Sequence, residues 1–342
     1  MVRVGLAVLA LAAGPALAGD ATVGEVRAFR DWAIGCDNAN GCTALGLEAD
    51  QAGGAYLALR RDAGPDAAPT IAVMVMTSGK LGKPSLRVLV PGSGGFGPKL
   101  YPVEANGDYL QASIPPEDVA ALAAALLKGT ELRLTIVDPG HDHAAEVVSL
   151  RGAAAALLYL DDRQQRIGGV TALARPGDAP ASTVPAPPPL PAVPRQTMTE
   201  LDPVPALPAG LKASSEPSCD GVDPVAFDLG GGTQLWGLCE IAGAYNTSYR
   251  LWLIDASGAR PASFRLPGRA ADDPAVLTEP SLNPDGLGLD AFDLGRGVGD
   301  CGDQADWGWD GKGFELLQYR ELQTCAGVLP EDWPLLWQTR TP

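Results

Sequence analysis

The 342-residue chain lacks any apolar run near the length of about 20 residues that a helix needs to cross a bilayer. Positive charge is also scarce, since 25 Lys and Arg face 41 Asp and Glu for a formal net charge of −16. Such an acidic chain is unsuited to binding nucleic acid or, unaided, an anionic membrane surface. We therefore expect no nucleic-acid partner and no transmembrane segment.

Residue patterns typical of several catalytic and metal sites are missing as well. No Cys-x-x-Cys occurs, and the two histidines, His141 and His143, lie far from every cysteine, which disfavours a zinc site. There is no Gly-x-Ser-x-Gly elbow, and Pro98 stands where a phosphate-binding loop over 92–99 would need its lysine. The sequence thus favours a non-catalytic protein and implies no cofactor.

The first eighteen residues have the three parts of a secretory signal peptide in the right order. Arg3 supplies the positive end, Val4–Ala13 the apolar run, and Ala16-Leu17-Ala18 the small-residue cleavage site. This predicts cleavage after Ala18 and a periplasmic protein, with the cell surface or secretion as alternatives.

A domain boundary is indicated where eleven prolines fall within residues 176–208. Proline lacks the backbone N–H and fixes φ, so this stretch suits an extended spacer rather than a helix or sheet interior. We therefore predict a first domain over 19–175, a Pro-rich linker over 176–210 and a second domain over 211–342.

The six cysteines divide along the same boundary, and in an exported chain they predict disulfides. Sequence alone does not determine which cysteines pair. Pairing in sequential order is our prediction: Cys36 with Cys42, Cys219 with Cys239, and Cys301 with Cys325.

We predict a mainly β protein with minor α. In the first domain, short runs rich in Val, Ile, Leu and Thr separated by turn residues favour an antiparallel β-sandwich. These runs are Tyr56–Arg60, Thr70–Thr77, Ser85–Val90, Glu131–Val137 and Ala144–Leu150. Helical periodicity predicts two covering helices, Glu117–Leu127 and Gly152–Ile167.

The second domain is predicted to be an all-β meander or sandwich, because its strand-like runs are separated by Gly- and Asp-rich turns. The runs are Val225–Leu229, Thr233–Glu240, Ser248–Asp255, Pro261–Leu266, Gly288–Leu294, Asp306–Trp309 and Phe314–Leu322.

Trp307 and Trp309 are the candidate binding residues of this second domain. Residues two apart on a strand share one face, so these indoles could form a platform that stacks on a glycan or peptide. The alternative is that they fill a small core, because one tryptophan buries a large apolar area.

Three acids beside glycines complete the candidate binding site: Asp300, Asp303 and Asp306. Together with Asp310 they could supply oxygen ligands to calcium, although their spacing misses the Asp-x-Asp-x-Asp-Gly loop pattern. Turn formation by these acids is the simpler interpretation.

Two stretches of the first domain resemble one known bacterial family. The segment Phe29–Cys36, followed by Gly41-Cys42, resembles the opening Trp-x-x-x-Cys strand of the invasion-associated locus B family of exported proteins. Ser149–Leu157 is similar to that family's closing strand and helix, with Arg151 and Ala153 in place of its usual lysine and aromatic residue.

The whole chain resembles a bacterial family catalogued as a domain of unknown function, numbered 1176. The resemblance rests on Trp32–Asn38, on Gly299–Gly302 with the sequence Gly-Asp-Cys-Gly, and on Trp307–Gly311 with the sequence Trp-Gly-Trp-Asp-Gly. It implies the fold and the compartment but no mechanism.

These observations predict a periplasmic protein that binds a ligand or interacts with the envelope, with an envelope protein or a glycan as partner. One alternative is a periplasmic hydrolase that acts on glycan or peptide through carboxylates of the second domain. The other is a structural accessory protein of the envelope.

Overall fold

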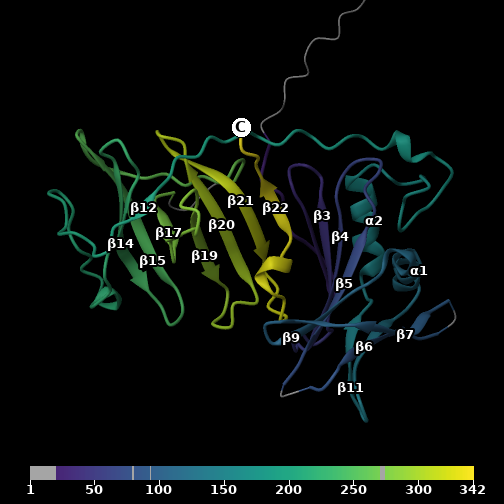
Figure 1. Cartoon of the computed structure of the whole chain (residues 1–342). Coiled ribbons are helices and arrows are strands. Elements are labelled where there is room, and N and C mark those ends of the chain that lie inside the picture. Colours follow the sequence, from purple (N-terminus) through teal and green to yellow (C-terminus); the bar gives the residue numbers. More distant parts are fainter. Residues whose placement is uncertain (1–20, 79–80, 93, 270–273) are drawn as a thin grey trace, which may run out of the picture.

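The chain forms two β-rich lobes in the computed structural model, which describes residues 21–78, 81–92, 94–269 and 274–342 (Figure 1). The predicted signal peptide lies outside these residues. Within them, the strands form four antiparallel sheets, two to a lobe, and both α-helices belong to the N-terminal lobe. The expected mainly β fold with minor α is confirmed. Among the described residues, no helix is long and apolar enough to span a bilayer.

The N-terminal lobe packs a seven-stranded sheet against a four-stranded one around a shared hydrophobic core. The larger sheet has the order β1 (Arg27–Phe29), β2 (Trp32–Cys36), β3 (Cys42–Leu47), β4 (Ala55–Arg61), β5 (Thr70–Met76), β9 (Tyr109–Ser113), β8 (Glu104–Asn106). The smaller has the order β11 (His141–Ser149), β10 (Glu131–Asp138), β6 (Ser85–Val90), β7 (Phe96–Pro102).

Two helices cover this sandwich, close to where the sequence predicts them. The α1 helix (Pro116–Leu126) begins with a proline at its first position, where the missing N–H costs nothing, and buries Val119, Leu122 and Leu126. The α2 helix (Ala153–Arg163) packs on β1, β2 and β3. It ends before the predicted Ile167, because the chain turns back and the Arg166 amide donates to the Asp161 carbonyl at 2.8 Å.

The C-terminal lobe consists of two meanders, in which most successive strands are neighbours. One sheet has the order β12 (Thr199–Glu200), β13 (Val225–Asp228), β14 (Gln234–Ala242), β15 (Thr247–Asp255), β16 (Gly258–Pro261), and β17 (Val276–Thr278) also pairs with β15. The other has the order β18 (Ser281–Leu282), β19 (Leu289–Leu294), β20 (Gly302–Trp309), β21 (Phe314–Leu322), β22 (Leu335–Gln338). Short 3₁₀ turns occupy Ala181–Thr183, Pro217–Cys219 and Pro330–Asp332.

One predicted strand of this lobe is misplaced. The sequence predicts a strand over Pro261–Leu266, whereas β16 occupies Gly258–Pro261. The reason is a tight turn before it, in which the Asp255 carboxylate accepts the Ser257 amide at 2.8 Å and brings β16 into register with β15 directly afterwards.

The seven-stranded sheet is covered on both faces, which explains why β2 and β3 are buried along their whole length. One face, including Trp32, packs on the smaller sheet of its own lobe. The other, including Leu45 and Tyr56, packs on Val328 and Trp333 of the C-terminal lobe. Burial on both faces is more usual for parallel sheets. The two lobes therefore share a hydrophobic interface.

The Pro-rich segment runs along one edge of both lobes (Figure 1). Its backbone amides donate to carbonyls of the C-terminal lobe: Val193 to Arg340 at 3.1 Å, Gln196 to Trp309 at 2.8 Å and Met198 to Gly286 at 2.8 Å. The edge strand β12 also lies within it. These bonds fasten the segment to the lobe that follows it.

Three disulfides join the cysteines in the sequential order predicted. Cys36–Cys42 closes the β2–β3 hairpin, Cys219–Cys239 ties a 3₁₀ turn to β14, and Cys301–Cys325 ties the start of β20 to the loop after β21. Each lies within one lobe. Disulfides of this kind form and persist in oxidising compartments.

Candidate functional site

Trp307 and Trp309 lie on β20 and are only 2% and 3% exposed. Trp307 packs edge-on against Phe264 with ring centroids 5.3 Å apart, and Trp309 packs against Phe314 at 5.2 Å. A stacking platform needs an open ring face, which neither indole has here. The structure therefore assigns both to the core of the C-terminal lobe and corrects the prediction of an exposed platform.

The predicted acids do not gather around one point. Among the described residues, the one group of donors close enough to share a metal ion is Asp300 with Cys301 and Cys325, and these two cysteines form a disulfide. Asp306 instead accepts a hydrogen bond from the Asn283 side-chain nitrogen at 2.7 Å. Asp310 accepts the backbone amides of its own turn, as expected of a turn-forming acid.

Asp300 is held in place by two charged or polar partners. Arg296 Nε lies 2.6 Å from one carboxylate oxygen, and the Gly327 amide donates to the other at 2.6 Å. Burial by itself would raise the pKa of Asp300, but these hydrogen bonds outweigh it and hold the pKa below its ordinary value. Asp300 is therefore an ionised anchor between Arg296 and Gly327.

This anchor lines a cleft of about 640 Å³ between the lobes, which we call the interlobe cleft. The N-terminal lobe contributes Met76 and Tyr109, and the C-terminal lobe contributes Val298 and Leu329. Met76 is 46% exposed and Val298 is 76% exposed. Clefts of this size between lobes commonly hold small molecules.

Polar groups in the interlobe cleft largely satisfy one another. The Tyr109 hydroxyl lies 2.6 Å from the Gly327 carbonyl oxygen and 3.0 Å from that of Gly53. Burial raises the pKa of Tyr109 to about 12, so it stays a neutral donor. The walls left to a ligand are mainly apolar, and the Arg296 guanidinium and the exposed Asp108 carboxylate are further charged groups of the lining.

Asp303 and Trp307 line a second, smaller cavity of about 190 Å³ in the C-terminal lobe, which we call the intersheet pocket. Phe264 and Tyr319 form further walls. The sequence thus named two residues of one pocket, although it assigned the tryptophan an exposed ring.

Asp303 sits in a row of carboxylates that crosses three strands. In the strand register it is opposite Asp293 on β19 and opposite Glu321 on β21. Burial, with the charges of Asp293 and Glu321, raises its pKa to about 7. A carboxyl group with this pKa can take up or release a proton near neutral pH.

Sequence reasoning named Asp300 but missed the other residues that form the interlobe cleft. Met76 and Tyr109 are far in sequence from Val298, and no motif connects them. One local signal was available: Val298 lies in Gly295–Gly299, where an apolar side chain among glycines and charged residues has no nearby core to enter. Such a valine indicates a binding surface where it lies with other exposed apolar side chains, as Val298 does with Met76 at this cleft.

Two comparisons with known proteins cover most of the chain. The sequence model of a family described as "Protein of unknown function (DUF1176)" matches residues 26–340. The uncharacterized protein YpfG of Escherichia coli (strain K12) is 31% identical over 341 residues, which cover 92% of this chain and 93% of the relative. The resemblance to family 1176 seen in the sequence is confirmed.

Part of the chain is also similar to a solved structure, the crystal structure of invasion associated protein b from Bartonella henselae. The TM-score is 0.32 and the identity 21%, and the match covers 41% of this chain and 99% of that chain.

Proposed function

The chain belongs to the DUF1176 family of proteins of unknown function, and we propose that it is an exported, non-catalytic binding protein of the bacterial envelope whose ligand occupies the interlobe cleft. The observation that carries the proposal is the exposure of Met76 and Val298 toward one cavity of about 640 Å³. Apolar side chains left in water at a concave site mark a place where burial by a partner is favourable.

The lining of the cleft indicates the class of ligand. Met76, Val298 and Leu329 suit an apolar body, while the Arg296 guanidinium, already paired with Asp300, offers its remaining donors to an acceptor group. We infer a small amphipathic molecule with an apolar body and an anionic or strongly accepting end.

Binding can be tested with 1-anilinonaphthalene-8-sulfonate, an apolar anion that fluoresces when it leaves water. Wild-type protein should bind it saturably, and Val298→Asp should weaken binding by about tenfold or more, because a carboxylate in an apolar wall must be desolvated and repels the sulfonate. A fluorescence titration measures both affinities.

The matched control is Ile241→Asp, which places the same charge at a 55% exposed apolar residue on β14 that does not line the cleft. It should bind the dye as the wild type does. Equal affinity in Val298→Asp and wild type, or no saturable binding by wild type, would contradict the proposal.

Sequencing the N-terminus of the purified protein tests export. If the signal peptide is cleaved as predicted, protein recovered from a periplasmic extract begins at Gly19. The three disulfides agree with an oxidising compartment. N-terminal sequencing that finds the first eighteen residues still attached, in protein confined to the cytoplasm, would overturn this part of the proposal.

A further inference from the structure

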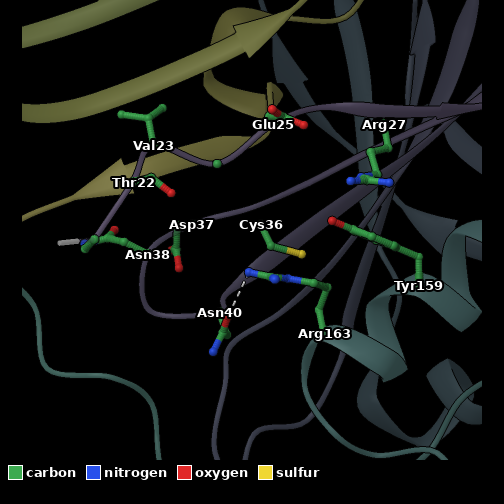
Figure 2. Close-up of a pocket in the computed structure, with 12 residues that line it drawn as sticks. Thr22, Val23, Glu25, Arg27, Cys36, Asp37, Asn38, Asn40, Tyr159 and Arg163 are labelled. Carbon is green, nitrogen blue, oxygen red and sulfur yellow. Dashed lines mark hydrogen bonds between the residues drawn. The ribbon is translucent and has the colours of Figure 1, made fainter. Parts of the chain in front are cut away.

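A second cleft, polar rather than apolar, lies beside the N-terminal segment, and we call it the arginine cleft. Its volume is about 390 Å³ (Figure 2). The residues that matter for its chemistry are Arg27 from β1, Asp37 and Asn40 from the β2–β3 turn, and Tyr159 and Arg163 from α2. Three separate parts of the chain therefore meet at this cleft.

Neither arginine of the cleft has a carboxylate partner within the described part of the chain. Arg163 Nη2 donates to the Asn40 side-chain oxygen at 3.2 Å, and the Arg27 guanidinium carbon lies 5.4 Å from the centre of the Tyr159 ring. Both are neutral contacts, so they orient the guanidiniums without cancelling their charge. Two arginines without an ion-pair partner among the described residues therefore face one cleft of an acidic chain.

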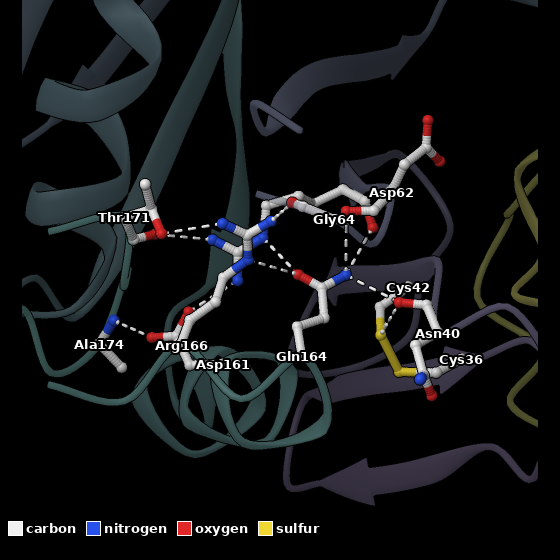
Figure 3. A network of polar contacts seen from close by, with 11 residues as sticks. Cys36, Asn40, Cys42, Asp62, Gly64, Asp161, Gln164, Arg166, Thr171 and Ala174 are labelled. Carbon is white, nitrogen blue, oxygen red and sulfur yellow. Dashed lines mark hydrogen bonds and ion pairs between the residues drawn. A yellow bond between two sulfur atoms is a disulfide. The ribbon is translucent and has the colours of Figure 1, made fainter. Parts of the chain in front are cut away.

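Arg163 is followed by a network of buried polar contacts, which Figure 3 shows around Gln164. Gln164, the next residue, is buried, and its side-chain nitrogen donates to the Asn40 carbonyl at 2.8 Å and to the Arg61 carbonyl at 2.9 Å. Asn40 has a positive φ of 63° in the turn that the Cys36–Cys42 disulfide closes. The partner of Arg163 is thus fixed before any ligand arrives.

Two acids also line the arginine cleft. The Asp37 carboxylate accepts hydrogen bonds from the backbone amides of Ala39 and Gly41, at 2.8 and 2.9 Å. It also accepts one from the Gln338 side-chain nitrogen at 2.6 Å. Burial raises the pKa of Asp37. Glu25 is exposed, and its side chain lies on the far side of the cleft from Arg163 (Figure 2). Neither acid forms an ion pair with Arg27 or Arg163.

From this arrangement we propose that the arginine cleft is an oxyanion site, which takes a phosphate or carboxylate group between Arg27 and Arg163. Guanidiniums match the geometry of both groups and donate two parallel hydrogen bonds to either. The Tyr159 hydroxyl, directed toward the same space in Figure 2, supplies a further donor. The site is separate from the interlobe cleft and does not depend on it.

Thermal unfolding tests the site with inorganic phosphate and with citrate, each at constant ionic strength set by sodium chloride. An anion that binds only the native state raises the midpoint temperature in a saturable way. Arg27→Ala and Arg163→Ala should each weaken the fitted affinity by about tenfold, the loss of one charge-assisted contact. Both side chains are exposed, so the variants should fold.

Arg133→Ala is the matched control, since Arg133 is an exposed arginine on β10 that does not line the cleft. It should bind as the wild type does. A stronger response to phosphate identifies a phosphoryl ligand, and a stronger response to citrate a carboxylate ligand. A wild-type midpoint that follows ionic strength alone, or equal affinities in Arg163→Ala and Arg133→Ala, would overturn the proposal.

Discussion

Asp161→Asn is expected to lower the free energy of unfolding by about 3–5 kcal/mol, although Asp161 contacts neither candidate ligand site. The Asp161 carboxylate lies 2.7 Å from Arg61 Nη2, and both side chains are completely buried. Its second oxygen accepts the Ala174 amide at 2.7 Å. Asp161 is the ion-pair partner of the buried Arg61, and its charge also acts on a second buried arginine, Arg166, which lies in the same network (Figure 3).

Loss of the Asp161 charge leaves both guanidiniums buried without a counter-charge. Arg166 is otherwise held by neutral oxygens, those of Gln164 at 3.1 Å and Thr171 at 2.8 Å, and by the Gly64 carbonyl. Asparagine preserves the volume of the side chain, so the change isolates the charge from packing. Chemical denaturation monitored by tryptophan fluorescence measures the free energy of unfolding.

An exposed ion pair provides the control for this prediction. Glu131 lies 2.6 Å from Arg133, and the two side chains are 30% and 50% exposed. Glu131→Gln should change the free energy of unfolding by less than about 1 kcal/mol, because water screens the pair. Adding Arg61→Met to Asp161→Asn should restore part of the loss by removing one buried cation. If Asp161→Asn lowers the free energy of unfolding as little as Glu131→Gln does, the buried ion pair adds nothing to stability.

Asp303→Asn is expected to stabilise the protein at pH 8, by about 2–4 kcal/mol. The pKa of Asp303 is about 7 in the folded chain against an ordinary 3.8, so the folded state binds this proton more tightly than the unfolded state. The stabilisation of the folded state by this proton is complete below about pH 4. It is lost as the pH rises to 7 and the carboxyl group ionises. Asparagine resembles the protonated acid and so avoids that loss.

Thermal unfolding midpoints of wild type and Asp303→Asn, measured from pH 4 to pH 8, test the predicted stabilisation. The two curves should coincide at pH 4 and separate with rising pH, the variant above the wild type. Glu315→Gln, an exposed acid on the neighbouring strand β21, should leave the curve unchanged. A pH profile of Asp303→Asn that runs parallel to wild type throughout would refute the raised pKa of Asp303.

Local features of the fold were predictable because their causes are local. The α1 helix follows from Pro116 at its first position and from the apolar period of Val119, Leu122 and Leu126. The prediction that the cysteines pair in sequential order, which the structure confirms, rests on pairs of cysteines that are near in sequence. Strand runs such as β5, β6 and β10 follow from alternating apolar residues between turn signals.

The candidate sites were predictable only in part, because the environment of a side chain is not local. Asp300 and Asp303 are three residues apart and beside the same kind of glycine turn. One meets Arg296 and Gly327 in the interlobe cleft and has a lowered pKa. The other is half-buried between two carboxylates and has a raised pKa. No sequence pattern distinguishes them.

By itself, the sequence determined the family and the β-rich composition of both lobes, since these depend on residue types and short spacings, and it allowed a prediction of the cysteine pairs that the structure confirmed. Only the tertiary structure decided that one sheet is buried on both faces, that Trp307 and Trp309 enter the core, and that Arg163 faces an open cleft without a counter-charge. The physical reason is that burial and electrostatic interaction depend on distances between segments a hundred or more residues apart, such as Arg61 and Asp161 or Tyr109 and Gly327.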